Sequence, residues 1–458
     1  MSFPRYPAYK DSRVEWLGSV PAHWRVERLK HVATVFPSNV DKKSYDDEAP
    51  VRLCNYTDVY YNDEIREDMD LMMATASAEQ IEKFSLRAGD TIITKDSETS
   101  DDIAISAYVP KDLPGVVCGY HLSMVRPKSG GNGRFLKRFF DSQVAKAQAA
   151  VTANGLTRVG LGQYAIDNLH IAVPPLEEQV GIGSFLDRET AKIDALVAEQ
   201  EQLITLLREK RQAVISHAVT KGLDSSVPMK DSGVEWLGEV PAHWQVKQLR
   251  HVARIVRGAS PRPAGDPKFF SSDDSDTTNV PWVTVAEITK DDSLYLTDVS
   301  ELLTPLGAEA SQRFERGTVI FSNSGATLGV PKILAIDCCA NDGVLAFKSL
   351  DQQVHREFLY FFLSTTTERL RTEMKQGGGQ PNLNTDIVKN IGVAVPSLNE
   401  QIAIVSAVRQ QTARFNDLIC EAQRGVSFLQ ERRSALISAA VTGQIDVRGL
   451  APEQEQAA

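Results

Sequence analysis

Two long stretches of the chain carry apolar residues every seven positions, with mostly polar and charged residues between them. The first, residues 174–224, reads PPLEEQVGIGSFLDRETAKIDALVAEQEQLITLLREKRQAVISHAVTKGLD. The second, residues 396–446, reads PSLNEQIAIVSAVRQQTARFNDLICEAQRGVSFLQERRSALISAAVTGQID. A heptad repeat of apolar residues is typical of a coiled-coil seam. We therefore expect two long helices, ended by Gly222 and Gly443.

The seam residues recur at heptad positions, and neither helix can bury its apolar stripe alone. We assign to the seam Leu186, Ile193, Leu196, Leu203, Leu207 and Val214 of the first helix and Val408, Phe415, Leu418, Leu429 and Leu436 of the second. Because a whole globular segment separates the two helices, we expect them to pair antiparallel, with approximate twofold symmetry. The alternative is that each helix packs only on its own domain.

The helices belong to a larger internal repeat. Residues 11–32 (DSRVEWLGSVPAHWRVERLKHV) and 231–252 (DSGVEWLGEVPAHWQVKQLRHV) are identical at 16 of 22 positions, and the two helical stretches at 20 of 51. The segments between each opening and its helix share only short fragments. The chain is therefore predicted to be two tandem units that share a frame and differ in content. Trp16 and Trp24 of the first opening are predicted to anchor the core.

The divergent segments alternate short β-rich runs with turn signals, and an amphipathic helix follows in each. We expect strands at 51–59, 90–94, 103–109, 116–125, 281–288, 318–322, 333–336 and 344–348, and helices near 135–151 and 355–376. The fold class is therefore α+β, with two mixed α/β domains, each built on a mainly antiparallel sheet, joined by the helix pair. The expected boundaries are 1–173 (first domain), 174–222 (first helix), 223–395 (second domain), 396–446 (second helix) and 447–458 (flexible tail).

Composition excludes several classes of protein. The 458 residues, 42% hydrophobic and 24% charged, suffice for two or more ordinary domains. The chain has no apolar run of about 18 residues and no secretory signal, so we expect a cytoplasmic protein without a membrane span. Its five scattered cysteines have no metal-binding spacing. Since phosphate-loop, nucleophile-elbow and methyltransferase motifs are missing, we expect neither catalysis nor a cofactor.

The repeated openings VEWLGSVPAHW and VEWLGEVPAHW, each followed by a divergent segment and a helix that starts PPLEEQ or PSLNEQ, carry a family resemblance. Together they resemble the DNA-specificity subunit of type I restriction–modification enzymes, over nearly the whole chain. The resemblance implies that each divergent domain reads one half of a split site in double-stranded DNA. It also implies that the paired helices set the spacing and dock two methyltransferase subunits, which carry S-adenosylmethionine and methylate adenine. Restriction subunits that use ATP are further implied partners.

Contacts to DNA bases are expected from polar residues on loops of the divergent domains. Two loops in each domain, and a proline-rich loop in the second, carry such residues. They are Lys95, Ser97, Thr99, Asn154, Thr157 and Arg158 in the first domain, and Arg262, Lys268, Asn323, Ser324, Thr327, Gln376, Gln380 and Asn382 in the second. Ordinary turn chemistry is the alternative for each loop.

The charge balance opposes DNA binding by these domains alone. Residues 33–134 contain 11 Lys and Arg against 18 Asp and Glu, and residues 253–350 contain 9 against 13. Because DNA affinity depends largely on phosphate neutralisation, we expect the partner subunits to contribute phosphate contacts. Three alternatives stay open: a protein scaffold that never binds DNA, a nuclease with dispersed carboxylates such as Asp90 and Glu98, and a methylation-only system.

Overall fold

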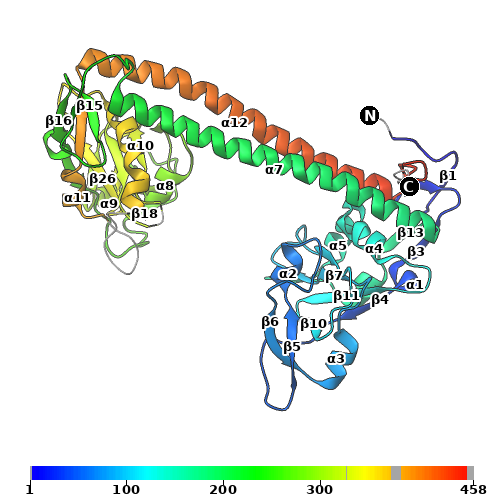
Figure 1. The fold of residues 1–458 in the computed structure, drawn as a ribbon. Helices are drawn as coiled ribbons and strands as arrows, with labels where there is room; N and C mark the ends of the chain where they lie inside the picture. Colours follow the sequence, from blue (N-terminus) through cyan, green and yellow to red (C-terminus); the bar gives the residue numbers. More distant parts are fainter. Residues whose placement is uncertain (1–2, 326, 373–382, 451–458) are drawn as a thin grey trace. The chain divides into compact units, whose positions relative to one another are not determined.

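The computed structural model describes residues 3–325, 327–372 and 383–450. The chain forms two compact units, residues 1–201 with 423–458 and residues 202–422. Each unit contains one domain of mixed helices and strands and a part of each long helix (Figure 1). The expected tandem repeat of two mixed domains is therefore confirmed. None of the helices within the described ranges has the length and apolarity that crossing a bilayer requires.

The two heptad stretches form the long helices α7 (Leu176–Lys221, 46 residues) and α12 (Leu398–Val441, 44 residues). Gly222 directly follows α7 with a φ of +79°, and Gly443 follows α12 with a φ of +76°. Residues with a side chain rarely adopt this conformation, so the two glycines mark the expected helix ends. In each unit, the parts of α7 and α12 that belong to it lie side by side and run antiparallel (Figure 1).

The buried stripe of each helix differs in one row from the predicted seam. Leu196, Leu203 and Leu418 are exposed, at 46%, 43% and 48%, so their assignment to the seam is wrong. The inward positions are taken by the next residues along, Val197, Ile204 and Ile419. A period of seven fixes one row of the stripe, but a sequence rich in leucine does not show on which side of that row the second one lies.

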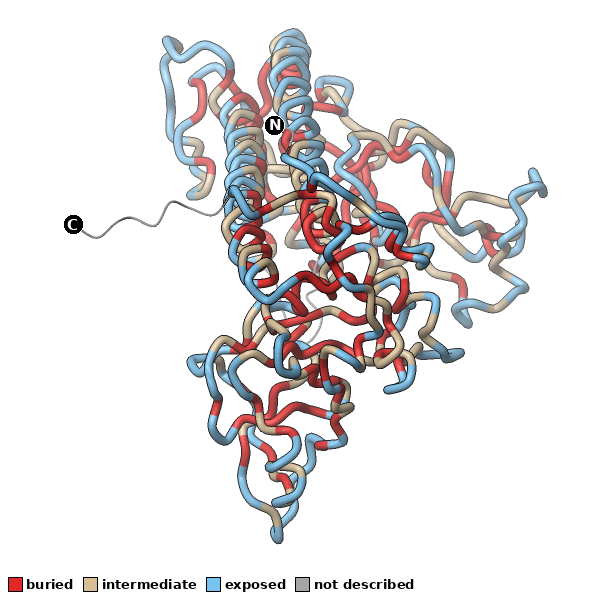
Figure 2. Tube along the Cα trace, turned by 90° about the vertical axis from the view of Figure 1, so that its right-hand side faces the viewer, coloured by how far each residue is buried: buried red, intermediate tan, exposed pale blue. Residues whose placement is uncertain are grey.

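The other predicted seam positions face inward to different degrees. Those that are buried are Leu186, Ile193, Val408 and Leu436. Those that are partly buried are Leu207, Val214, Phe415 and Leu429. Most of the remaining helix surface is exposed, as Figure 2 shows in pale blue.

The first unit contains a four-stranded antiparallel sheet in the order β4-β11-β7-β9 and a three-stranded sheet in the order β10-β5-β6. Their strands are β4 (Ala33–Pro37), β11 (Leu122–Pro127), β7 (Thr91–Thr94), β9 (Ser106–Tyr108), β10 (Val116–Cys118), β5 (Ala49–Cys54) and β6 (Met72–Ala76). Three strand pairs complete the unit: β1 (Tyr9–Asp11) with β2 (Ser19–Pro21), β3 (Arg25–Arg28) with β13 (His170–Val173), and β8 (Asp96–Ser97) with β12 (Val159–Gly160). The short helices are α1 (Leu29–Val32), α2 (Tyr56–Tyr60), α3 (Ala78–Phe84), α4 (Gly133–Asp141), α5 (Gln143–Thr152) and α6 (Gln163–Asp167).

The second unit contains two five-stranded sheets, in the orders β17-β26-β23-β24-β20 and β18-β21-β19-β25-β22. Their strands are β17 (Arg254–Arg257), β26 (Val344–Lys348), β23 (Val319–Ser322), β24 (Pro331–Leu334), β20 (Tyr295–Leu296), β18 (Phe270–Ser271), β21 (Glu301–Leu303), β19 (Val280–Val283), β25 (Cys338–Ala340) and β22 (Gln312–Phe314). Two strand pairs are β14 (Met229–Asp231) with β15 (Glu239–Pro241) and β16 (Gln245–Gln248) with β27 (Gly392–Val395). The short helices are η1 (Leu249–His251), α8 (Val285–Thr289), α9 (Pro305–Glu309), α10 (Arg356–Thr372) and α11 (Thr385–Lys389).

Some predicted elements are divided in the structure. Residues 51–59 form β5 and then α2, because Asn55 and Asp58 make a capping box that starts a helix. Residues 135–151 form α4 and α5, divided at Ser142, whose side chain caps the second helix. A polar cap interrupts an element without changing the apolar pattern on either side. In the second unit, the helix predicted near 355–376 is α10, which spans Arg356–Thr372. Positions 373–376 of the prediction lie outside the described ranges.

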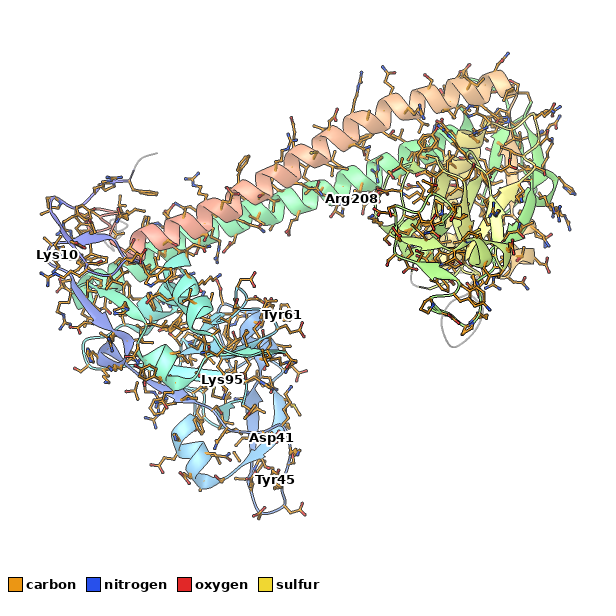
Figure 3. All side chains as sticks on the ribbon, turned by 180° about the vertical axis from the view of Figure 1, so that it is seen from behind. Lys10, Asp41, Tyr45, Tyr61, Lys95 and Arg208 are labelled. Carbon is orange, nitrogen blue, oxygen red and sulfur yellow. The ribbon has the colours of Figure 1, made fainter. Side chains whose placement is uncertain are left out.

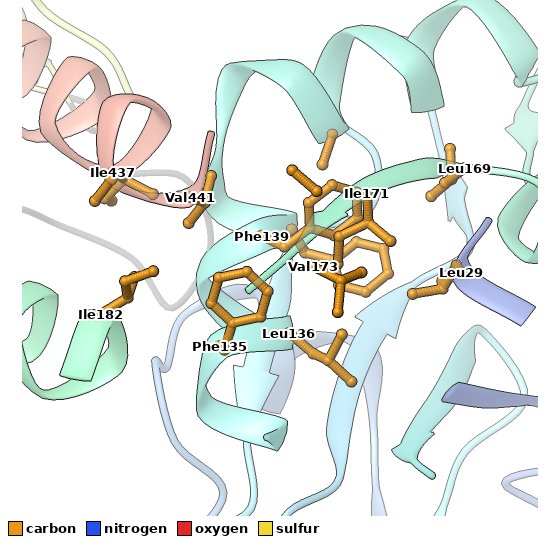
Figure 4. Close-up of a cluster of buried hydrophobic side chains, with 14 of the residues drawn as sticks. Leu29, Phe135, Leu136, Phe139, Leu169, Ile171, Val173, Ile182, Ile437 and Val441 are labelled. Carbon is orange, nitrogen blue, oxygen red and sulfur yellow. The ribbon is translucent and has the colours of Figure 1, made fainter. Parts of the chain in front are cut away.

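The core of each domain includes both long helices. In the first unit, Phe135 of α4 is buried in one cluster with Ile182 of α7 and with Ile437 and Val441 of α12 (Figure 4). The last turns of α12 therefore pack on the first domain, although they belong to the second repeat. The second unit repeats this arrangement, because Ile215 of α7 joins the second core. The alternative in which each helix packs only on its own domain is wrong.

The repeated opening and the repeated helix start form one clamp in the first unit. Glu178 accepts hydrogen bonds from the indole of Trp24 (3.0 Å) and the hydroxyl of Tyr6 (2.9 Å), and its Oε1 lies 2.7 Å from Nε2 of His23. Its side chain is only 10% exposed. The contacts explain why an aromatic opening and a Pro-x-Leu-x-Glu-Gln helix start occur together in the sequence.

The second unit has an equivalent clamp. Glu400 accepts a hydrogen bond from the indole of Trp244 (2.9 Å) and lies 3.0 Å from Nε2 of His243. The following residue, Gln401, accepts from the backbone N–H of His355 (2.7 Å) and donates to the carbonyls of residues 353 and 396 (2.8 Å each). The repeated Glu-Gln pair thus joins each opening and each domain to the start of a long helix.

Trp16 does not anchor the core as predicted. It is 45% exposed, whereas Trp24 is fully buried. The equivalent Trp236 is better covered, because its ring packs 5.7 Å from that of Phe362 on the uninterrupted helix α10. The first domain has two shorter helices, α4 and α5, in place of α10.

Replacing Glu178 with Gln is expected to lower the free energy of unfolding by about 2–3 kcal/mol, because the buried donors of Trp24 and Tyr6 lose a carboxylate acceptor and the exposed His23 loses its contact. Glu177→Gln is the matched control, since Glu177 is the preceding residue and is exposed. Urea unfolding of both variants measures the difference. Equal stability of the two variants would contradict a stabilising role for the clamp.

Candidate nucleic-acid interface

Loops from distant parts of the first domain meet at one edge of its four-stranded sheet. Because β11 runs antiparallel to β4 and β7, its start lies beside their ends. We call residues 38–39, 95–99, 120–121 and 154–160 the first sheet edge. It contains all six first-domain residues that the sequence suggested for DNA contact.

A short strand pair joins the two predicted DNA-binding loops of this domain. β8 pairs with β12 in antiparallel register, so that Ser97 faces Val159. The backbone N–H of Leu161 also donates to the carbonyl of Lys95 (2.7 Å). Loops that were assigned separately in the sequence therefore form one surface.

The polar residues of the first sheet edge differ in their exposure. Thr99, Asn154, Thr157 and Arg158 are exposed. Ser97 is only 8% exposed, so its side chain is not presented to solvent as predicted; the β8–β12 pairing covers it. The first four are the better placed to contact a ligand.

Lys95 (labelled in Figure 3) is held by its neighbours rather than free. Its ammonium donates to the carbonyl of Ser38 (2.9 Å) and lies 4.7 Å from the ring centre of Tyr120. Burial lowers the pKa of Lys95. A cation held in this way can orient the Tyr120 ring by a cation–π contact.

Sequence reasoning missed Tyr120 and His121 of this edge. Tyr120 is 51% exposed, and Nδ1 of His121 lies 2.9 Å from Oδ2 of Asp96. They occupy the turn between β10 and β11, which we predicted to be one continuous strand. The glycine before Tyr120 was the available signal for a turn.

The second domain has an equivalent edge, which we call the second sheet edge: residues 258–262, 323–325 and 341–343. Its strands β17 and β23 end beside the start of β26. The backbone N–H of Leu383 donates to the carbonyl of Asn323 (2.8 Å), which repeats the Leu161–Lys95 contact of the first domain. The two edges therefore share a backbone scheme and carry different side chains.

The side chain of Asn323 is fully buried, contrary to its predicted exposure. Within the described parts of the chain, neither its amide oxygen nor its amide nitrogen has a hydrogen-bond partner. The residue directly follows β23, which lies between β26 and β24 in its sheet. It therefore does not present its amide to solvent in this structure.

The other candidates of the second domain fall into three groups. Arg262 and Lys268 are exposed; Nη2 of Arg262 lies 3.5 Å from Asp342, and the ammonium of Lys268 lies 5.6 Å from the ring centre of Phe269. Ser324 and Thr327 are partly buried. Those that lie outside the described residues are Gln376, Gln380 and Asn382.

One of the two carboxylates named for the nuclease alternative has a structural explanation. Asp90 is fully buried and accepts two hydrogen bonds of 2.7 Å from the guanidinium of Arg126. Glu98 is exposed. Among the described residues, no group of three or more His, Cys, Asp and Glu side chains is arranged to hold a metal ion. Asp90 therefore serves the fold.

Comparisons with known proteins place these features in a family. Residues 21–206 and 241–422 each match the family model described as "Type I restriction modification DNA specificity domain". The MjaVIII specificity subunit of a type I restriction enzyme from Methanocaldococcus jannaschii is 25% identical over 62% of this chain and 64% of its own length. The EcoKI specificity subunit of Escherichia coli K12 is 22% identical over 78% of this chain and 75% of its own length.

A solved structure shares the fold. It comes from work on complex assembly and conformational transition of the type I R-M system. Its TM-score is 0.64 at 18% sequence identity, and the match covers 92% of this chain and 98% of that chain.

Proposed function

Because this chain belongs to the family of type I restriction–modification DNA-specificity subunits, we propose that each domain reads one half of a split DNA site through its sheet edge. The observation that supports this most is the repeated backbone scheme at the two edges. A common frame with different side chains suits two readers of different sequences. Base edges in the major groove are distinguished by such polar side chains.

The exposed residues of the first sheet edge are the proposed base-reading groups of the first domain. Arg158 can donate two hydrogen bonds to a guanine, and Asn154 can pair with an adenine edge. Tyr120 adds an apolar ring held by Lys95. In the second domain, the exposed cations among the candidate residues are Arg262 and Lys268.

We assign most phosphate contacts to partner subunits. Both domains carry more acidic than basic residues, so their own net field opposes DNA. The proposed partners are two methyltransferase subunits that carry S-adenosylmethionine, joined in a complete system by restriction subunits that use ATP. The chain itself is proposed to supply specificity and no catalysis.

The long helices are proposed to form a coiled coil that sets the gap between half-sites and docks the methyltransferases. The support is the length of α7 and α12 and their contribution to both units. In this proposal, residues 1–173 and 223–395 are the DNA-reading domains, and residues 174–222 and 396–446 are the spacer. The expected flexible tail does not begin at residue 447, because Val447 is buried in the core of the first unit and Arg188 donates to the carbonyl of Leu450. A methylation-only complex would use the same arrangement.

Arg158→Ala is expected to weaken discrimination at one or two bases of one half-site by about 1–3 kcal/mol, because a bidentate base contact is lost. Arg262→Ala should act only on the other half-site. The measurement is the rate of adenine methylation by the chain with its methyltransferase partners, across a library of substituted sites.

Mapping methylated adenines in the host genome supplies the target for this library. A uniform loss of rate at all sites would mean that the arginine contacts phosphate instead of a base. Binding of the methyltransferases without any effect of the chain on DNA binding would favour the scaffold alternative.

A further inference from the structure

Two arginines occupy equivalent positions of the long helices and make equivalent contacts. Arg211 of α7 and Arg433 of α12 are 222 residues apart, which is the offset that aligns the two repeated helices. Each contacts the other long helix and also a loop of a domain. Their side chains are equally accessible, at 23% and 25%.

In the first unit, Arg433 bridges α7 and the loop that follows α2. Its Nε donates to Oδ1 of Asp194 (2.8 Å), and its Nη2 lies 3.4 Å from Oδ2 of Asp63. Asp194 belongs to α7, and Asp63 belongs to the first domain. One side chain therefore links the domain to both helices of the pair.

In the second unit, Arg211 makes the same bridge. Its Nη1 donates to Oδ1 of Asn416 on α12 (2.7 Å), and its Nη2 lies 3.3 Å from Oδ2 of Asp292. Asn416 is the residue of α12 that aligns with Asp194 of α7. Asp292 lies in the loop after α8, which follows a sheet strand as α2 does in the first domain.

Buried lysines from unrelated elements hold the two acidic loops in place. Lys137 of α4, 3% exposed, lies 2.8 Å from Oδ1 of Asp63. Lys332 of β24, 2% exposed, lies 2.6 Å from Oδ1 of Asp291. The domains have diverged, yet each fixes a carboxylate loop where the arginine of a helix can reach it.

The charges around Asp63 favour its ionised form. Burial opposes ionisation, but Lys137, Arg138 and Arg433 outweigh it and lower the pKa of Asp63 on balance. The carboxylate is therefore ionised at neutral pH and available to Arg433.

In both units the arginine comes from the helix of the other repeat. α7 begins beside the first domain but supplies Arg211 to the second, and α12 supplies Arg433 to the first. We infer that Arg211 and Arg433 are positioning residues that fix the orientation of each DNA-reading domain on the helix pair. If each domain reads one half-site, as proposed above, the two arginines should also sharpen discrimination between DNA sites whose half-sites are separated by gaps of different length. This consequence rests on the proposed function.

The expected loss of orientation preference depends on how exposed the Arg211–Asp292 and Arg433–Asp63 pairs are. Partly exposed ion pairs contribute little to stability, so neither arginine is needed for folding. Loss of one bridge should reduce the preference for one orientation by about two- to fivefold. The base preference within each half-site should not change, because neither arginine lies at a sheet edge.

A distance measurement tests the orientation without any DNA. Cys420 on α12 is exposed, and the other four cysteines are buried, so Cys420 accepts a spin label selectively. Asp298→Cys supplies a second label on an exposed loop of the second domain. The Arg211→Ala variant should broaden the distance distribution between these labels. The control is Arg208→Ala, an exposed arginine of the same helix (labelled in Figure 3).

A charge exchange separates this bridge from a general loss of stability. Arg211→Glu should broaden the distribution, and Arg211→Glu with Asp292→Arg should narrow it again, since Asn416 is neutral and tolerates either charge. The inference would be overturned if the distance distributions of Arg211→Ala and Arg208→Ala had the same width. It would also be overturned if the double variant kept the broad distribution of Arg211→Glu.

Methylation assays test the consequence. The complex of the full chain with its methyltransferase subunits is given sites whose gap is lengthened or shortened by one base pair. Arg211→Ala and Arg433→Ala should each reduce the ratio of rates on correct and altered gaps by about two- to fivefold relative to Arg208→Ala and Arg432→Ala. Unchanged ratios would overturn the role in spacing. If the wild-type complex methylates no site, the proposed function fails instead, and the label distances still decide the orientation.

Discussion

Exchanging residues 33–170 for the equivalent segment of a related specificity subunit is expected to change one half of the methylated sequence and leave the other half intact. The exchanged segment contains the first sheet edge, whereas the contacts of Trp24 with Glu178 lie outside it. Because base-specific contacts are local, a new edge should bring a new half-site. Sequencing of methylated adenines before and after the exchange measures the result.

The structure adds a condition for a successful exchange. Within the segment, Phe135 packs on both long helices, and the guanidinium of Arg138 donates to Asp187 of α7 (2.7 Å). The segment taken from the relative should keep an aromatic residue at position 135 and a cation at position 138. Without them, the contacts between the domain and α7 would be lost. A control exchange that restores the original segment should restore the original half-site. A change in both halves of the target would show that the units read DNA as one composite surface.

Inserting one residue after position 201 of α7 and one after position 422 of α12 is expected to abolish assembly and methylation. Each insertion rotates the following helix by about 100°, which turns the buried row that contains Ile204 outward. Displacing several buried aliphatic side chains should cost more than about 4 kcal/mol. Thermal unfolding followed by circular dichroism, together with methylation rates, measures both effects.

Inserting a full heptad at the same two places is the matched control. Seven residues keep the seam in register and add about 10 Å at 1.5 Å per residue. With DNA rising about 3.4 Å per base pair, the longer protein should prefer a gap about three base pairs longer. An unchanged gap preference in a folded heptad variant would rule out the helices as the spacer.

The family and the tandem plan were visible in the sequence because they depend on local and repeated patterns. Heptad spacing, helix-ending glycines and two copies of an aromatic opening need no tertiary information to be recognised. The openings and the helix starts recur together because they are in contact: His23 lies against Glu178 and His243 against Glu400.

The candidate site could be predicted only in part. Polar loop residues such as Thr99 and Arg158 were found because turns favour such residues and the structure exposes them. Asn323 has the same chemistry but is buried, and Tyr120 was missed within a predicted strand. Burial depends on neighbours that are distant in sequence, so composition could not separate these cases.

The sequence by itself determined the class of protein, the repeat and the helices, since these depend on periodicity along the chain. Only the tertiary structure decided that Val197 rather than Leu196 faces inward, because pairing with a second helix selects one of two adjacent rows. It also decided that two separate loops join through β8 and β12. The bridge from Arg433 to Asp63 was also decided by the tertiary structure. Antiparallel pairing of the helices brings the end of the second repeat to the domain of the first.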